Sequence, residues 1–158
     1  MIKRHVLNRL LLLRLIQLAG VVNGATRLQK LIFKAESIGR DQNIPTFNYR
    51  FIRWHYGPYS EELKSDLNFL IINKLIIAKD NEFTLTPLAK ENMDKVDNTF
   101  EQLGSDALLS MVLDKYAEMN FDKLLSEIYK EYSIETNYET GDTVFPVIDE
   151  EAGELSHV

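Results

Sequence analysis

The sequence predicts a mainly α-helical protein with a small β-hairpin, arranged as a winged-helix-like domain followed by C-terminal helices. Apolar residues recur at helical spacing through most of the chain, and a hairpin signal interrupts them at Asp80–Asn81. The order helix, helix, strand, helix, two-stranded hairpin is that of a winged helix. We expect the winged-helix-like domain over residues 3–103, a helical extension over 104–132 and an acidic, mostly disordered tail over 133–158.

The first two helices are predicted from their apolar spacing. The helix over about 3–19 is apolar nearly all round, so we expect it to be central, with Gly20 as its stop. The second helix begins after Thr26, a fair N-cap, and ends at Gly39. Its buried stripe is Leu28, Leu31, Ile32, Ala35 and Ile38, and the opposite face carries Arg27, Lys30 and Lys34.

An aromatic-rich strand and a third helix follow. Residues 47–56 are extended in character, with Phe47, Tyr49 and Phe51 on one side. The third helix starts near Pro58–Ser60 and runs to about 73. The hairpin turns at Asp80–Asn81, and Thr86–Pro87 caps and starts a fourth helix over about 87–103.

Two more helices, over about 105–119 and 121–132, make the extension. Residues 133–158 carry seven acids and no Lys or Arg, which is typical of a disordered tail. The apolar island VFPVID at 144–149 either docks on a partner or packs back on this domain, and the sequence leaves both open.

Charge is divided unevenly along the chain. Residues 1–60 hold ten Lys or Arg against two acids, whereas residues 61–158 hold eight against twenty-two. Such a split can indicate a nucleic-acid-binding face, or two halves that attract each other within the fold.

Three stretches, TRLQKLIFKAE at 26–36, WHYGPYSEELKSDLNFL at 54–70 and FTLTPLAKE at 83–91, resemble the YwgA-like proteins, which are related to the SocA-like (Panacea) antitoxin domain. The HYGPYS-type core is the specific part, and the shared stretch covers roughly residues 5–95. The resemblance implies a helical, winged-helix-like fold. It also implies a regulatory or toxin-neutralising role rather than an enzymatic one, and carries over no catalytic residue.

The candidate nucleic-acid-binding surface lies on the second helix and the strand. The third helix is a poor groove reader, since Glu61, Glu62 and Asp66 repel phosphate. The basic residues are Arg27, Lys30, Lys34, Arg40, Arg50 and Arg53. The alternative is that this face is solvated or paired within the fold.

The motif around His55 has a structural and a chemical interpretation. Gly57–Pro58 predicts an abrupt strand-to-helix turn, with Trp54, Tyr56 and Tyr59 clasping the second and third helices and Ser60 capping the third. His55 beside aromatics and acids allows a general acid–base site, but no spacing here provides an orienting partner or a substrate pocket. We therefore expect a packed histidine rather than a catalytic one.

The favoured function is a non-enzymatic regulatory module that binds a macromolecule, either nucleic acid through the basic face or a protein. The first alternative is an antitoxin-like protein-interaction module without DNA binding, and the second is a small enzyme centred on His55. A homodimer is a further option. With no cysteine and three histidines we expect no metal or other cofactor, and a cytoplasmic protein. Arg14 interrupts the leucine-rich N-terminus, so no membrane segment is expected.

Overall fold

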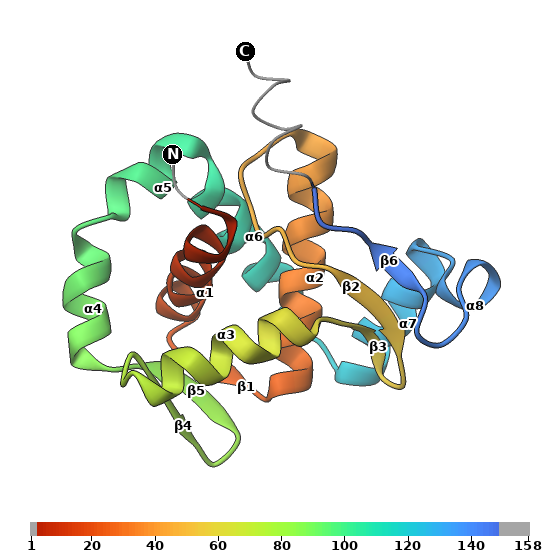
Figure 1. The fold of residues 1–158 in the computed structure, drawn as a ribbon, viewed down its shortest axis with the longest axis horizontal. Coiled ribbons are helices and arrows are strands. Elements are labelled where there is room, and N and C mark those ends of the chain that lie inside the picture. The colour runs from red at the N-terminus through yellow and green to blue at the C-terminus, as the bar shows by residue number, and fades with distance from the viewer. Residues whose placement is uncertain (1–2, 149–158) are drawn as a thin grey trace.

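The computed structural model describes residues 3–148, except for the side chains of residues 97 and 98 (Figure 1). The helices are α1 (Arg4–Ala19), α2 (Ala25–Gln42), α3 (Glu61–Ile72), α4 (Pro87–Asp94), α5 (Asp97–Leu103), α6 (Ser105–Tyr116), α7 (Phe121–Glu131) and α8 (Ile134–Asn137). The strands are β1 (Val22–Asn23), β2 (Phe51–Trp54), β3 (Gly57–Tyr59), β4 (Ile76–Lys79), β5 (Glu82–Leu85) and β6 (Thr143–Phe145).

The predicted class, mainly α with a small β component, is confirmed. The described residues form two three-stranded antiparallel sheets, ordered β1-β5-β4 and β3-β2-β6. In the first sheet β4 and β5 make the expected hairpin, and Asp80 (φ 53°) and Asn81 (φ 61°) occupy the left-handed region that a tight hairpin turn requires. The winged-helix assignment stays a prediction, with β1 beside this hairpin in its favour. The second sheet was not predicted.

Local capping signals are correct where a hydroxyl precedes the helix. The Ser60 hydroxyl accepts from the Leu63 N–H at 3.2 Å, and Thr86 accepts from Ala89 at 3.2 Å. The predicted Thr26 cap is wrong: α2 begins at Ala25, with Gly24 (φ 99°) in the cap position and no side-chain bond.

Two predicted helix ends are also wrong. Helix α2 continues past Gly39 to Gln42, because Gly39 serves packing instead: a Cβ there would lie 2.2 Å from Thr46 Cγ2. The single helix expected over 87–103 is interrupted at Lys95–Val96, which separates α4 from α5.

The core surrounds α1 and α2, and the C-terminal helices share it. Helix α6 packs against both α1 and α2, and α7 packs against α2 (Figure 1). Leu108, Val112, Leu124 and Ile128 are at most 3% exposed, so the helical extension is buried against the N-terminal part of the chain.

The disorder predicted for residues 133–148 is wrong, while residues 149–158 lie outside the described part of the chain. Strand β6 pairs with β2, and the Phe145 ring stacks on Phe33 with centroids 4.6 Å apart. Asn48 and Ile148 exchange two hydrogen bonds. The island at 144–148 therefore packs back on its own domain, one of the two outcomes that its sequence left open.

Candidate functional site

The stretch WHYGPYS forms a hairpin rather than a strand-to-helix turn. Strand β2 pairs with β3 through Arg53 opposite Pro58 and Trp54 opposite Gly57, and His55 and Tyr56 make the turn. Gly57 has φ +92°, which a residue with a side chain rarely adopts. The Gly57–Pro58 prediction is corrected accordingly: the pair opens β3, and the chain enters α3 only at Ser60.

The predicted aromatic clasp is open. A pocket of about 230 Å³ lies between α2, α3 and the β2–β3 hairpin. Trp54 is 41% exposed and Tyr56 66% exposed, and both lie along the pocket instead of filling the space between the helices. We call this cavity the hairpin pocket; its lining is Ala25, Thr26, Leu28, Gln29, Lys30, Trp54, Tyr56, Gly57, Tyr59, Leu63, Lys64 and Leu67.

Two consecutive side chains of α2 hold β3 in place beside this pocket. Gln29 donates to the Ser60 carbonyl at 2.9 Å and accepts from the Ser60 N–H at 2.9 Å, so it pairs with the backbone as a strand would. The Lys30 ammonium donates to the Pro58 carbonyl at 2.9 Å. The Gln29–Lys30 pair of the TRLQKLIFKAE stretch thus binds the GPYS segment of the WHYGPYS stretch.

Burial dominates the electrostatics of Lys30. Its side chain is 1% exposed, and this desolvation lowers the pKa of Lys30 to about 7. Among the described residues the Pro58 carbonyl is its one hydrogen-bond acceptor, and no carboxylate pairs with it. Burial therefore moves the pKa of this amine down into the neutral range.

Lys30 and Lys34 were expected on an exposed face, and that expectation is wrong. Lys34 is 2% exposed and its Nζ lies 2.6 Å from Glu131 of α7. Burial lowers the pKa of Lys34, but the Glu131 hydrogen bond and the nearby Tyr132 and Tyr116 raise it, and the net direction is upward. Both faces of α2 are buried in this part of the helix, because β3 covers Lys30 and α7 covers Lys34.

The arginines of the predicted surface are also engaged within the fold. Arg27 donates to the Met119 carbonyl at 2.7 Å, and Arg53 donates to the Tyr138 carbonyl. Arg40 bridges Glu36 and the Pro146 carbonyl, at 3.1 and 2.8 Å. Arg50 is exposed and donates to the Thr143 hydroxyl at 2.8 Å. The six residues follow α2 and the second sheet without converging on one open surface.

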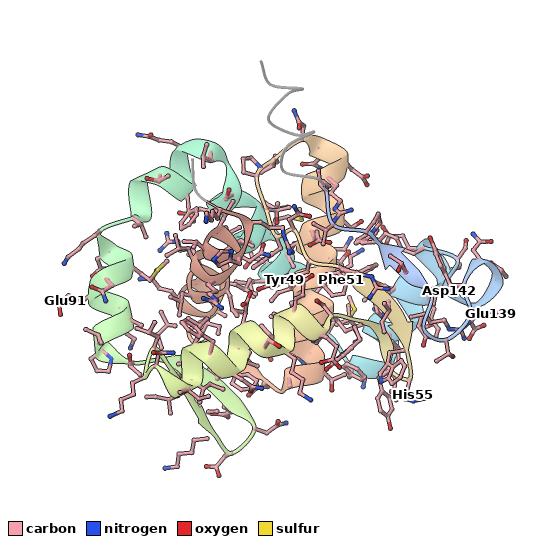
Figure 2. The ribbon with its side chains drawn as sticks, viewed as in Figure 1. Tyr49, Phe51, His55, Glu91, Glu139 and Asp142 are labelled. Carbon is pink, nitrogen blue, oxygen red and sulfur yellow. The ribbon has the colours of Figure 1, made fainter. Side chains whose placement is uncertain are left out.

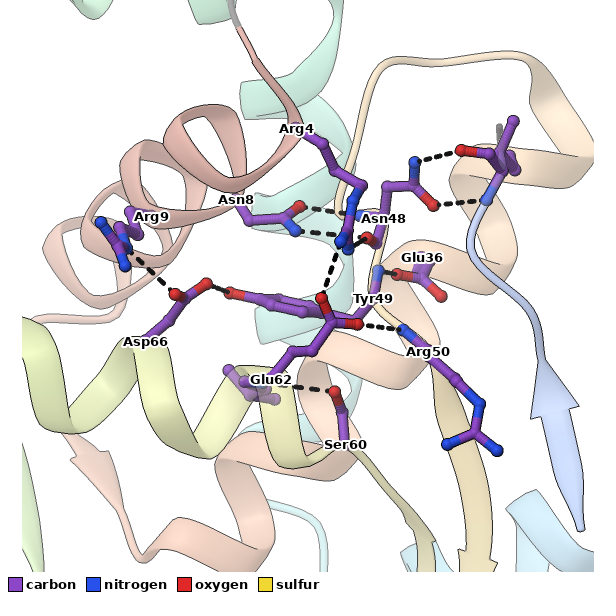
Figure 3. A network of polar contacts seen from close by, with 12 residues as sticks. Arg4, Asn8, Arg9, Glu36, Asn48, Tyr49, Arg50, Ser60, Glu62 and Asp66 are labelled. Atoms are coloured by element: carbon purple, nitrogen blue, oxygen red, sulfur yellow. Dashed lines mark hydrogen bonds and ion pairs between the residues drawn. The ribbon is translucent and has the colours of Figure 1, made fainter. Parts of the chain in front are cut away.

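The acids of α3 take part in a polar network that joins α1, α3 and the strand leading into β2 (Figure 3). Asp66 accepts from the Tyr49 hydroxyl at 2.7 Å and from Arg9 at 3.0 Å. Glu62 pairs with Arg4 at 2.8 Å. These carboxylates position α3, which gives them a structural role.

Glu36 is the most deeply buried acid of this network. It is 0% exposed and accepts from the Tyr49 N–H (Figure 3). Burial raises the pKa of Glu36 to about 8, against the opposing effects of that N–H and of the Arg40 guanidinium.

His55 lies at the exposed tip of the β2–β3 hairpin, at the edge of the molecule in Figure 2. Its ring lies 4.7 Å from that of Trp54, and among the described residues it has no hydrogen bond or ion pair. It does not line the hairpin pocket. The packed environment expected for His55 is therefore wrong, and the residue also lacks the orienting partner that a general base needs.

Within residues 3–148, no group of three or more His, Asp or Glu side chains is placed to hold a metal ion. No helix in that same range is long and apolar enough to cross a bilayer. The features left for function are the hairpin pocket and the exposed surface beside it. Of the pocket lining, Gln29, Leu63, Lys64 and Leu67 were missed, because their pattern is that of ordinary helix faces.

Comparison with protein-family models, with curated proteins and with solved structures gives no match to this chain. The resemblance of the three motifs to the YwgA-like proteins therefore stays a prediction. What the protein does has to be inferred from the geometry of its surface.

Proposed function

We propose that the protein is a non-enzymatic regulatory module that binds a protein partner through α3 and the adjoining hairpin. The observation that carries this proposal is a group of exposed apolar side chains on α3, on β4, which packs against α3, and at the start of α4. We call it the α3–β4 patch; it consists of Phe69 (41% exposed), Ile72 (77%), Ile77 (43%) and Leu88 (54%).

These residues lie on elements that pack in succession, α3 on β4, β4 on β5 and β5 on α4. Several exposed apolar side chains on such adjoining elements favour a protein-binding surface, whereas isolated surface leucines or isoleucines are common. Phe69 is held in place by the Arg9 guanidinium, 3.8 Å above its ring. An aromatic ring and β-branched side chains on a rigid helix and strand bind at low entropic cost.

Charge favours a protein over nucleic acid as the partner. Of the six cations proposed for phosphate, Lys30 and Lys34 are buried and the four arginines are bonded within the fold. Glu61 is exposed at the start of α3, where it opposes the approach of phosphate. The resemblance to antitoxin-related proteins supports the same partner class.

The experiment places a photo-crosslinking amino acid at Ile72 in the full chain, expressed in its native cell. We expect ultraviolet light to give a discrete adduct with another protein, and Ile77→Asp to abolish it because a carboxylate cannot enter an apolar interface. The same amino acid at Glu139, an exposed residue far from α3, is the control (Figure 2).

Three other outcomes would contradict the proposal, and each points to a different interpretation of the patch. An adduct between two copies of this chain would make the patch a homodimer interface, and equal adducts from positions 72 and 139 would show non-specific contact. No adduct from position 72, together with duplex-DNA binding at about 50 mM salt that is lost in Arg50→Ala, would favour the nucleic-acid alternative.

A further inference from the structure

The hairpin pocket is a partly open cavity whose lining is mainly apolar, with a few polar and cationic groups among the apolar ones. Trp54, Tyr56, Tyr59, Leu63 and Leu67 give it aromatic and aliphatic walls. The only charged residues in its lining are Lys30 and Lys64, both cationic. An apolar cavity with a few converging polar groups is the usual form of a small-molecule site.

Lys30 differs from its neighbour on α2 in lacking a counter-ion. Lys34, one turn further along, is equally buried but pairs with Glu131 at 2.6 Å. Lys30 has only the Pro58 carbonyl among the described residues, and an ammonium has three N–H donors. Among these residues the ammonium therefore has more N–H donors than acceptors, and an anion would supply both the missing acceptor and the missing charge.

The N-terminus of α2 is a second feature of the pocket that favours an anion. Ala25 and Thr26 line the same pocket and form the first turn of an 18-residue helix, which has no acid in that turn and no side-chain cap. The field at a helix N-terminus is positive. The cavity therefore offers an apolar volume, a buried amine and a positive helix end together.

We propose that the hairpin pocket binds a small organic acid, with its aryl or branched alkyl body between Trp54 and Leu67 and its carboxylate on Lys30. A volume of about 230 Å³ suits an acid with on the order of ten to fifteen non-hydrogen atoms. The inference goes beyond the proposed partner surface and does not depend on it.

Proton linkage follows from this arrangement. The acid binds the charged form of Lys30, whose pKa in the empty pocket is about 7. The titratable groups that line the pocket with it are Tyr56 in the hairpin turn, Tyr59 on β3 and Lys64 on α3, while α7 contributes the apolar Leu125 near Gly57. Affinity is then steady below about pH 6 and falls about tenfold per unit above pH 7, since the amine must first take up a proton.

The test titrates the full chain with phenylacetate up to about 10 mM and follows the fluorescence of Trp54, which is the one tryptophan of the chain and lies in the pocket wall. We expect saturable binding at pH 6. Phenylacetamide, which keeps the ring without the charge, and acetate, which keeps the charge without the ring, should each bind at least tenfold more weakly.

Two variants test which lysine the carboxylate of phenylacetate contacts. Lys30→Met should remove the preference for phenylacetate over phenylacetamide, whereas Lys64→Met, at the exposed rim, should change it less than threefold. If Lys30→Met does not fold by circular dichroism, the pH profile of the wild-type chain decides: phenylacetate affinity must fall above pH 7 while phenylacetamide affinity stays level.

Equal affinity for phenylacetate and phenylacetamide in the wild type would overturn the proposal, as would a preference that survives Lys30→Met. The absence of saturable phenylacetate binding at 10 mM, checked by amide chemical shifts in NMR spectra, would overturn it too.

Discussion

Single buried charges set how this protein should respond to pH. Glu36 has a pKa of about 8 in the fold, against a usual value of 4.5, because burial disfavours its charged form. Lys30 has a pKa of about 7, against 10.5, for the same reason. The two shifts act in opposite directions and their pH ranges overlap only between about 7 and 8, so Glu36 can be measured below pH 7 and Lys30 above pH 8.

We predict that stability falls between pH 5 and pH 8 because of Glu36. The folded chain binds that proton more tightly than the unfolded chain does, so the stabilisation is present below pH 4.5 and is lost as pH rises through about 8. Glu36→Gln should remove this dependence, which is at most about 1.4 kcal/mol per pH unit. Urea unfolding of both chains at pH 5 to 8 measures it.

Glu139→Gln, at an exposed glutamate, is the control for that experiment and should keep the wild-type profile. Parallel profiles for wild type and Glu36→Gln would show that Glu36 is ionised throughout, paired with Arg40. Above pH 8, the pH dependence that the Glu36→Gln chain retains reports Lys30, whose contribution to stability is full above pH 10.5 and is lost as pH falls through about 7.

Among the elements, the β2–β3 hairpin depends on a close approach that only glycine permits. A Cβ on Gly57 would lie 2.6 Å from Leu125 Cδ1 and 3.0 Å from Lys30 Cε, so this backbone packs directly on α7 and α2. Gly141 has nearly the same φ, +95° against +92°, but a Cβ there would meet nothing within 4 Å.

This contrast gives a matched pair of variants. Gly141→Ala should cost only the strain of a positive φ, about 1–3 kcal/mol. Gly57→Ala should cost more, because Leu125 or Lys30 must also move, and it should alter the hairpin pocket. Denaturant midpoints measure both costs, and equal costs would show that the contact with α7 adjusts freely.

The sequence predicted those features of the elements that depend on interactions between residues close together in the chain. The Ser60 and Thr86 hydroxyls each accept from the N–H three residues on, an interaction that depends only on adjacent residues, which is why these two predicted caps were correct. Alternation placed Phe47, Tyr49 and Phe51 on one side of the extended segment, and in the structure each is at most 2% exposed. Gly39 and Gly57 were misjudged, since their partners Thr46 and Leu125 are known only from the packed chain.

At the scale of the molecule, residues 134–148 are an integral part of the fold. Val144 is 7% exposed, Phe145 packs on Phe33 and Phe51, and the Arg40 and Arg53 side chains donate to carbonyls of this segment. It covers the edge of β2, which would otherwise present unpaired backbone groups.

We predict that a chain ending at Ser133 is less stable than the full chain by ~2 kcal/mol or more, since a largely buried aromatic side chain alone contributes about that much. A chain ending at Ile148 keeps every described contact and is the control. Thermal unfolding of the three chains measures the difference. If the chain ending at Ser133 unfolds at the same temperature as the control, residues 134–148 do not stabilise the domain.

The sequence by itself determined the helical class, the β4–β5 hairpin, two of the helix caps and the shared side of Phe47, Tyr49 and Phe51, because these depend on neighbours a few residues away. Only the tertiary structure decided what the cations of α2 do. Lys34 meets Glu131 across 97 positions of sequence, and Lys30 meets Pro58 across 28. Helical spacing places a side chain on a face, but distant segments decide whether that face is covered. The hairpin pocket, where the carboxylate proposed for Lys30 would bind, is likewise lined by α2, α3 and the β2–β3 hairpin, which only the fold brings together.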